Sequence, residues 1–286
     1  MSQQSTVRDD ELLGAVSIPY RGGSMPGYLS LVDPGGPPRP TMIYTNGFGE
    51  RCEDGYAVIG AAALRRGYNF LTYDGPGQGA MLRDGRVTMR PDWENVLGPV
   101  VDFASTIPEV DAGAIVHFGH GLGGYLVARY AAHDHRAAAI VCNDGMTTFY
   151  ASSPHIPEPI LELIEDERDD EAAPLLDALM RQDPRMRRGL STGQRVFGEG
   201  TAVEYVRRTA DYTLTADDIR RISTPVLVLE NRDDASLPGQ AANFARAMTA
   251  PVHHVVVSGA DVVCETVFDY LATNVPSTRG WRGRLG

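Results

Sequence analysis

Short apolar runs rich in β-branched residues alternate along this chain with longer stretches that have helical periodicity. This alternation predicts an α/β fold in which helices wrap a mostly parallel sheet of about eight strands, because parallel neighbours need a crossover between them. The tight turn at 21–23 joins the first two strands directly, so these two are expected to form an antiparallel edge. The expected strands are 12–20, 25–32, 41–45, 69–73, 114–118, 137–141, 225–229 and 252–257, and the helices between them include 55–66, 92–105 and 123–133.

The segment 143–213 interrupts this alternation of strands and helices, because no strand is expected within it. We interpret 146–212 as a helical cap inserted into a single domain that spans 1–286. Sheets of this kind bind ligands at the carboxyl ends of their strands. A cap at that edge would narrow the site and exclude water. Amphipathic helices are predicted within the cap at 159–167, 170–181 and 201–210.

A glycine-rich turn, Gly119-His120-Gly121-Leu122-Gly123, lies between an expected strand and an expected helix. A strand, a sharp turn and a helix form the context of the nucleophile elbow, Gly-x-Ser-x-Gly. The flanking glycines let the backbone turn sharply beside the helix. The central position, which carries the serine in that motif, is Gly121 here.

Four further stretches occur in an order and spacing that are typical of one family. They are 46–48 (Asn-Gly-Phe), 73–79 (Tyr-Asp-Gly-Pro-Gly-Gln-Gly), 90–94 with 99–102, and 238–241 with 259–265. With the elbow, they make the chain resemble the α/β-hydrolase superfamily over nearly its whole length. The resemblance is greatest to the capped branch of C–C-bond hydrolases that is often labelled dipeptidyl-aminopeptidase-like. It implies an α/β-hydrolase fold with a helical cap.

The resemblance also implies where a Ser-His-Asp triad would lie. The acid falls on Asp234, but the histidine position is Val263 and the nucleophile position is Gly121. Serine supplies the nucleophilic oxygen and histidine moves its proton, so the usual covalent chemistry lacks both groups. The chain therefore resembles an atypical member, comparable to the bottromycin-type peptide aspartate epimerases that also lack Ser and His. The backbone N–H groups of Phe48 and Leu122 fall at the positions of the oxyanion-hole donors.

Three functions remain open for such a chain. We favour a non-hydrolytic enzyme, an isomerase, epimerase, cyclase or lyase, that acts on a carbonyl-containing natural-product or peptide intermediate. Oxyanion-hole donors stabilise a developing enolate as well as a tetrahedral intermediate, so this chemistry needs only a base in addition. The second hypothesis is a ligand-binding pseudo-hydrolase without turnover. The third is a C–C or ester hydrolase in which a carboxylate activates water.

The candidate bases are Asp234 and Glu53. Glu53 has the alternative role of an acid that favours a helix N-terminus. His120 is a candidate replacement base, but a packed scaffold residue is the simpler interpretation. Gly121 and Val263, the vacated triad positions, are expected to line the pocket floor. The other residues expected around the substrate are Gly47, His120, Asp144 and Phe149.

Composition excludes several other classes of function. All 26 basic residues are arginine, so Schiff-base chemistry on a lysine is excluded. The formal charge of −11 argues against a nucleic-acid partner, and no apolar run is long enough to cross a membrane. No phosphate loop, dinucleotide fingerprint or metal-ligand spacing is present, so we expect no cofactor and no metal. A cytoplasmic location is expected, and homodimers are common in the family that the chain resembles.

Overall fold

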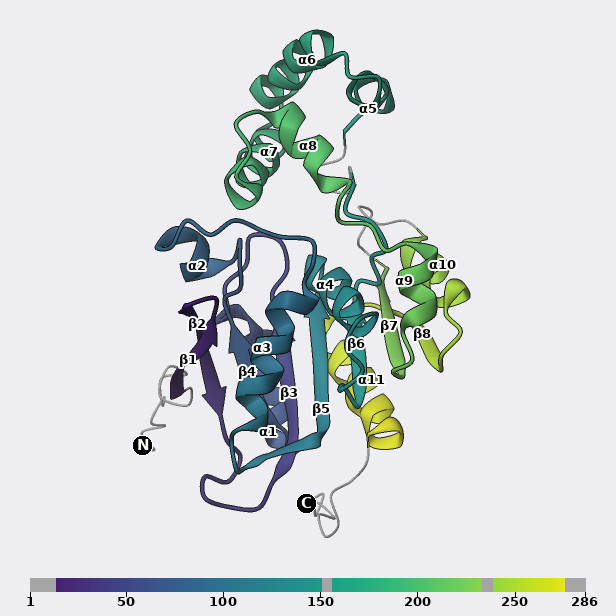
Figure 1. Cartoon of the computed structure of the whole chain (residues 1–286). Coiled ribbons are helices and arrows are strands. Elements are labelled where there is room, and N and C mark those ends of the chain that lie inside the picture. Colours follow the sequence, from purple (N-terminus) through teal and green to yellow (C-terminus); the bar gives the residue numbers. More distant parts are fainter. Residues whose placement is uncertain (1–13, 151–155, 233–238, 276–286) are drawn as a thin grey trace, which may run out of the picture.

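The computed structural model describes residues 14–150, 156–232 and 239–275. Within them one eight-stranded sheet has the order β1-β2-β4-β3-β5-β6-β7-β8 (Figure 1). This sheet confirms the predicted α/β-hydrolase fold. The strands are β1 (Gly14–Tyr20), β2 (Gly23–Ser30), β3 (Arg39–Thr45), β4 (Asn69–Tyr73), β5 (Val110–His120), β6 (Ala139–Asn143), β7 (Val226–Asn231) and β8 (Val252–Val257).

The antiparallel part of the sheet is confined to one edge. β1 pairs with β2 and β2 pairs with β4 in antiparallel register, whereas all the pairings from β4 through β8 are parallel. The tight turn between β1 and β2 explains the first pairing, as the sequence predicted. The parallel strands end at one edge of the sheet, and the loops that follow β3, β5 and β6 therefore meet there.

Helices cover both faces of the sheet (Figure 1). One hydrophobic cluster joins the sheet to α3 (Glu94–Ser105), α4 (Leu122–Ala131) and α10 (Gln240–Ala247). A second cluster joins the opposite face to α1 (Ala61–Arg65), to the π-helical turn Tyr56–Gly60 before it, and to α11 (Ala260–Asn274). The central strands are buried on both sides, which explains why they are continuous apolar runs in the sequence.

Four helices follow β6 and form a layer of their own beyond the carboxyl ends of the strands (Figure 1). They are α5 (Glu158–Glu165), α6 (Asp169–Gln182), α7 (Pro184–Phe197) and α8 (Ala202–Thr209). Two chain segments run side by side below them: the N–H of Phe149 donates to the carbonyl of Tyr212 (2.9 Å), and that of Leu214 donates to the carbonyl of Thr147 (2.8 Å). We refer to α5–α8 as the cap.

Two short helices complete the described chain. α2 (Gly79–Arg83) follows β4 near the cap, and α9 (Ala216–Arg221) leads from the cap back to β7. Among the described residues, no helix has the length and the apolar composition that a membrane span requires.

Candidate functional site

The turn between β5 and α4 has the sharp, positive-φ backbone of a nucleophile elbow. Gly121 has φ 53° and ψ −120°, and its N–H donates to the carbonyl of Asn143 at the end of β6 (2.8 Å). The flanking glycines are sterically required: a Cβ on Gly119 would lie 2.0 Å from the carbonyl oxygen of Gly123, and one on Gly123 would lie 2.2 Å from that of Thr45. The three-glycine pattern is therefore explained by backbone packing at 119 and 123 and by conformation at 121.

Position 121 itself has room for a side chain. A Cβ built on Gly121 meets no atom within 4 Å. The positive φ of 53°, and not a lack of space, is therefore what favours glycine at this position.

The loop after β3 lies directly on this elbow. A Cβ on Gly47 would lie 2.8 Å from the carbonyl oxygen of His120, so the two backbones are in close contact. Within the described chain no acceptor is bonded to the N–H of Phe48 or of Leu122, the first residue of α4. Both N–H groups thus remain available to an acceptor, and their predicted role as oxyanion donors stays a prediction.

A carboxylate–imidazole pair connects the loop to the elbow. Glu50 Oε1 lies 2.8 Å from Nδ1 of His120, and Glu50 Oε2 accepts the N–H of Gly47 (2.7 Å). Burial acts to raise the pKa of Glu50, but the hydrogen bond and charge of His120, with the Gly47 N–H and the Tyr44 hydroxyl, outweigh it and lower that pKa. A carboxylate partner favours the proton on Nδ1 and makes Nε2 the basic nitrogen of the ring.

Glu53 has different neighbours. Its carboxylate lies by the thiol of Cys52 (3.6 Å) and near Asp74, and its own side chain is exposed. The ligand atoms of Cys52, Glu53 and Asp74 lie within 4.8 Å of one another. However, Asp74 already accepts the N–H groups of Cys52 and Ala80 (2.8 Å each), and burial raises the pKa of the Cys52 thiol. This arrangement holds two loops together and does not resemble a metal site.

A comparison of the sequence with models of known protein families identifies the family of the chain. The model of the alpha/beta hydrolase family matches residues 34–266. The chain belongs to the alpha/beta hydrolase family.

The curated relatives of this alpha/beta hydrolase are fungal proteins. It is 31% identical over 226 residues to "Hydrolase ORFZ" of Pyricularia oryzae, covering 74% of this chain and 53% of that protein. It is also 31% identical over 227 residues to "20-hydroxy-prefusarin hydrolase FUS2" of Gibberella moniliformis, covering 77% and 52%. The chain thus spans about half the length of these relatives.

Solved structures confirm the fold. The 2,6-dihydroxy-pseudo-oxynicotine hydrolase matches with a TM-score of 0.70 at 20% identity, over 95% of this chain and 72% of that one. The alpha/beta hydrolase GrgF from Penicillium sp. sh18 matches with a TM-score of 0.64 at 20% identity, over 92% of this chain and 99% of that one. At this level of identity the likeness concerns the fold alone.

The other predicted site residues of this alpha/beta hydrolase lie in several environments. Asp144 follows β6 with a left-handed backbone (φ 71°), which an aspartate tolerates better than most residues. Val263 lies in the first turn of α11 within the hydrophobic cluster of that face, so its predicted place on the pocket floor stays a prediction. Asp234 lies outside the described residues.

Phe149 belongs to an aromatic cluster between the cap and the oxyanion loop. Its ring lies 5.4 Å from that of Phe48 and stacks on Phe197 of α7 at 5.9 Å. Tyr212 contacts Phe197 edge-on at 4.8 Å. This cluster fixes the cap against the loop that carries the Phe48 N–H.

Glu50 is the site residue that sequence reasoning missed. Glu53 and Glu50 both follow β3, and periodicity does not show which of them turns toward the elbow. A usable signal was the position of His120 inside the elbow, because a histidine there needs a partner on the adjoining loop.

The open space at position 121 leads to a prediction for Gly121→Ser. We expect this variant to fold with a loss of stability of about 1–2 kcal/mol, because a serine must adopt the left-handed backbone but meets no atom. We expect no esterase activity, because position 263 remains valine. Urea unfolding and a p-nitrophenyl acetate assay measure the two effects. As the matched control, Gly123→Ser should fail to give soluble protein; equal stability of the two variants would contradict this account.

Proposed function

We propose that this chain is a natural-product enzyme that activates a substrate carbonyl for a non-hydrolytic reaction, an isomerisation, epimerisation, cyclisation or elimination. The observation that carries the proposal is the elbow, which keeps its sharp positive-φ turn at Gly121 while position 121 bears no nucleophile. In this proposal the turn presents the N–H of Leu122 to the site. An enolate oxygen uses the same donors as a tetrahedral intermediate.

The proton transfer in this proposal belongs to the Glu50–His120 pair. The carboxylate orients the ring and stabilises its protonated form, as the acid of a catalytic triad does. In the proposed reaction His120 takes a proton from the carbon next to the carbonyl, and the N–H groups of Phe48 and Leu122 hold the enolate oxygen. Return of the proton to another face or atom gives an epimer or isomer. Glu53 and Asp234 remain the competing bases.

The names of the relatives support the substrate class. Several are fungal hydrolases, and one is named for a specific intermediate, 20-hydroxy-prefusarin. We therefore propose a carbonyl-containing natural-product or peptide intermediate as the substrate. The same names favour a second candidate, a hydrolase in which a carboxylate activates water directly.

A solvent-isotope experiment separates these functions. In D₂O, the protein is incubated with a panel of β-ketoesters and β-ketoamides, and the products are analysed by mass spectrometry and by NMR. We expect deuterium at the carbon next to the carbonyl without cleavage of the acyl group. Cleavage of these compounds or of p-nitrophenyl esters would establish the hydrolase instead, and saturable binding without exchange would establish a binding protein.

A further inference from the structure

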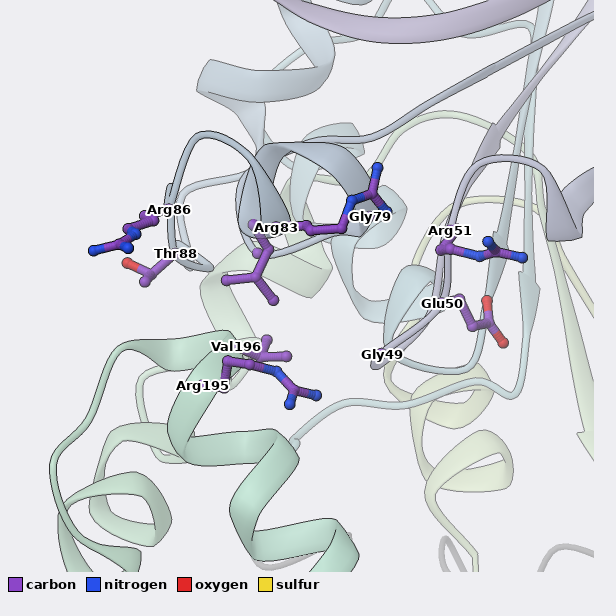
Figure 2. A pocket seen from close by; sticks show the side chains of 11 residues that line it. Gly49, Glu50, Arg51, Gly79, Arg83, Arg86, Thr88, Arg195 and Val196 are labelled. Atoms are coloured by element: carbon purple, nitrogen blue, oxygen red, sulfur yellow. The ribbon is translucent and has the colours of Figure 1, made fainter.

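A cavity of about 620 Å³ lies next to the candidate site, between the loop after β3, the loop and helix after β4, and α7 of the cap. Figure 2 shows the side chains that line it, with Arg195 extending from α7 into the space between the cap and the loop of Gly49. Glu50, the partner of His120, forms part of the wall. The cavity therefore adjoins the proposed proton-transfer pair.

The charged groups of this wall are unbalanced. The lining includes four arginines, Arg51, Arg83, Arg86 and Arg195, but a single carboxylate, Glu50, whose two oxygens are already bonded to His120 and Gly47. The whole chain has the opposite balance, with a net charge of −11. A local excess of guanidinium groups on an acidic protein is a specific feature of this cavity.

Two of the four arginines are not neutralised nearby. Arg83 pairs with Asp84 (3.1 Å) and Arg51 pairs with Asp54 (3.6 Å). By contrast, Arg86 and Arg195 have no hydrogen bond or ion pair within the described part of the chain.

The two remaining arginines point in different directions. Figure 2 shows the side chain of Arg86 directed outward, away from the loop of Gly49, whereas that of Arg195 extends toward this loop. Arg195 is therefore the cation without a nearby partner that enters the cavity.

We propose that this cavity binds a carboxylate of the substrate, held by Arg195, while the rest of the ligand extends toward the elbow. This inference rests on the proposed function, because it assigns the substrate class of the same site: a keto acid whose carboxylate is distant from the reacting carbonyl. Guanidinium groups bind carboxylates through paired N–H donors. The side chains of Leu82 and Val196 provide apolar wall for the body of the ligand.

The inference is tested with octanoate and its neutral isostere octanamide, titrated into the whole protein and followed by ligand-observed NMR. We expect octanoate to bind more tightly than octanamide, and its affinity to fall about tenfold in Arg195→Gln. Arg181→Gln, on α6 of the same cap but outside the cavity wall, is the matched control and should bind as the native protein does. Raising the salt concentration should weaken octanoate binding alone, because the arginines are exposed.

Equal affinities for octanoate and octanamide, or an unchanged octanoate affinity in Arg195→Gln, would overturn the inference. Tighter binding of inorganic phosphate than of octanoate would overturn the carboxylate assignment. Because these titrations need no turnover, they fail or succeed separately from the isotope experiment. Deuterium exchange without a preference for octanoate over octanamide would contradict only the proposed carboxylate site. A preference for octanoate without deuterium exchange would contradict only the proposed function.

Discussion

His120→Gln is expected to lower turnover by about 10²–10³-fold while the protein remains folded, because glutamine can accept and donate hydrogen bonds but cannot take up the proton. Glu50→Gln should lower turnover by a smaller factor, about 10–100-fold, because the ring loses the charge that stabilises its protonated form. The Nδ1–Oε1 contact of 2.8 Å couples the two side chains. Their effects should therefore be less than additive in the double variant.

Turnover is measured as the initial rate of solvent-deuterium incorporation into the substrate that responds in the panel described above. Glu53→Gln is the matched control, since it removes a carboxylate from the same loop that is bonded to neither His120 nor Gly47. A loss of activity in Glu53→Gln with none in Glu50→Gln would assign the base to Glu53. A loss in Asp234→Asn alone would assign it to Asp234.

The pH dependence distinguishes a proton-transfer role from a structural one. Because the pKa of Glu50 is lowered, its carboxylate stays charged through the weakly acidic range, and it supports His120 throughout that range. In the native protein the rate should fall as the pH decreases and His120 becomes protonated. In Glu50→Gln this acid limb should move to lower pH, since a neutral partner no longer stabilises the imidazolium. A purely structural pair would leave the position of the limb unchanged.

The strands were predictable because each is a short apolar run bounded by turn residues. Asn69–Tyr73 and Val252–Val257 match their predicted bounds, whereas β5 is longer at both ends than the predicted 114–118. The extra residues of β5 include Asp111 and Gly113, which lie at an irregularity of the β3–β5 register, between the pair of Val110 with Arg39 and the pair of Ile115 with Thr41. Periodicity therefore predicts that a strand is present more reliably than it predicts where the strand begins and ends.

The helix α7 was missed because its sequence disfavours a helix locally. It contains Gly189 and Gly193, both of which lower helix propensity. The structure explains the second glycine, since a Cβ on Gly193 would lie 2.1 Å from the ring of Tyr205 in α8. Packing within the cap thus outweighs propensity. Arg195, on the last turn of this helix, could not be placed by the sequence for the same reason.

The site itself was predictable only in its backbone. The elbow follows local rules, so the turn at Gly121 could be predicted from the sequence, whereas the donor roles of Phe48 and Leu122 were implied by the family resemblance and stay predictions. The Glu50–His120 pair joins residues 70 positions apart, and no local pattern selects Glu50 over Glu53. Side-chain partners across two loops depend on the packing of the strands that carry them, which a single sequence does not specify.

The largest expected effect of pH on stability concerns His117 in the middle of β5. Its side chain is fully buried beside the ring of Tyr130 (4.9 Å), and neither ring nitrogen has a hydrogen-bond partner in the described part of the chain. Burial lowers the pKa of His117 to about 3. The unfolded chain therefore binds a proton below about pH 6.5 that the native protein does not bind.

This difference in proton binding should make the protein less stable as the pH decreases. As the pH falls from 6.5 toward 3, the free energy of unfolding should decrease by about 1.4 kcal/mol per pH unit, or roughly 5 kcal/mol in total. Above pH 6.5 this contribution is constant, because His117 is neutral in both states. His117→Leu should remove this slope, since leucine fills the apolar site without a titratable group.

Urea unfolding at intervals between pH 7 and pH 4 measures the slopes, and the comparison uses the change with pH rather than the absolute stability of each variant. His135→Gln is the matched control, because His135 is exposed and its replacement should leave the slope as in the native protein. Identical slopes in the native protein and His117→Leu would mean that His117 is protonated in the folded state. In that case the imidazolium would need a buried acceptor near Tyr130. The loss of stability at acidic pH would then have to come from protonation of carboxylates.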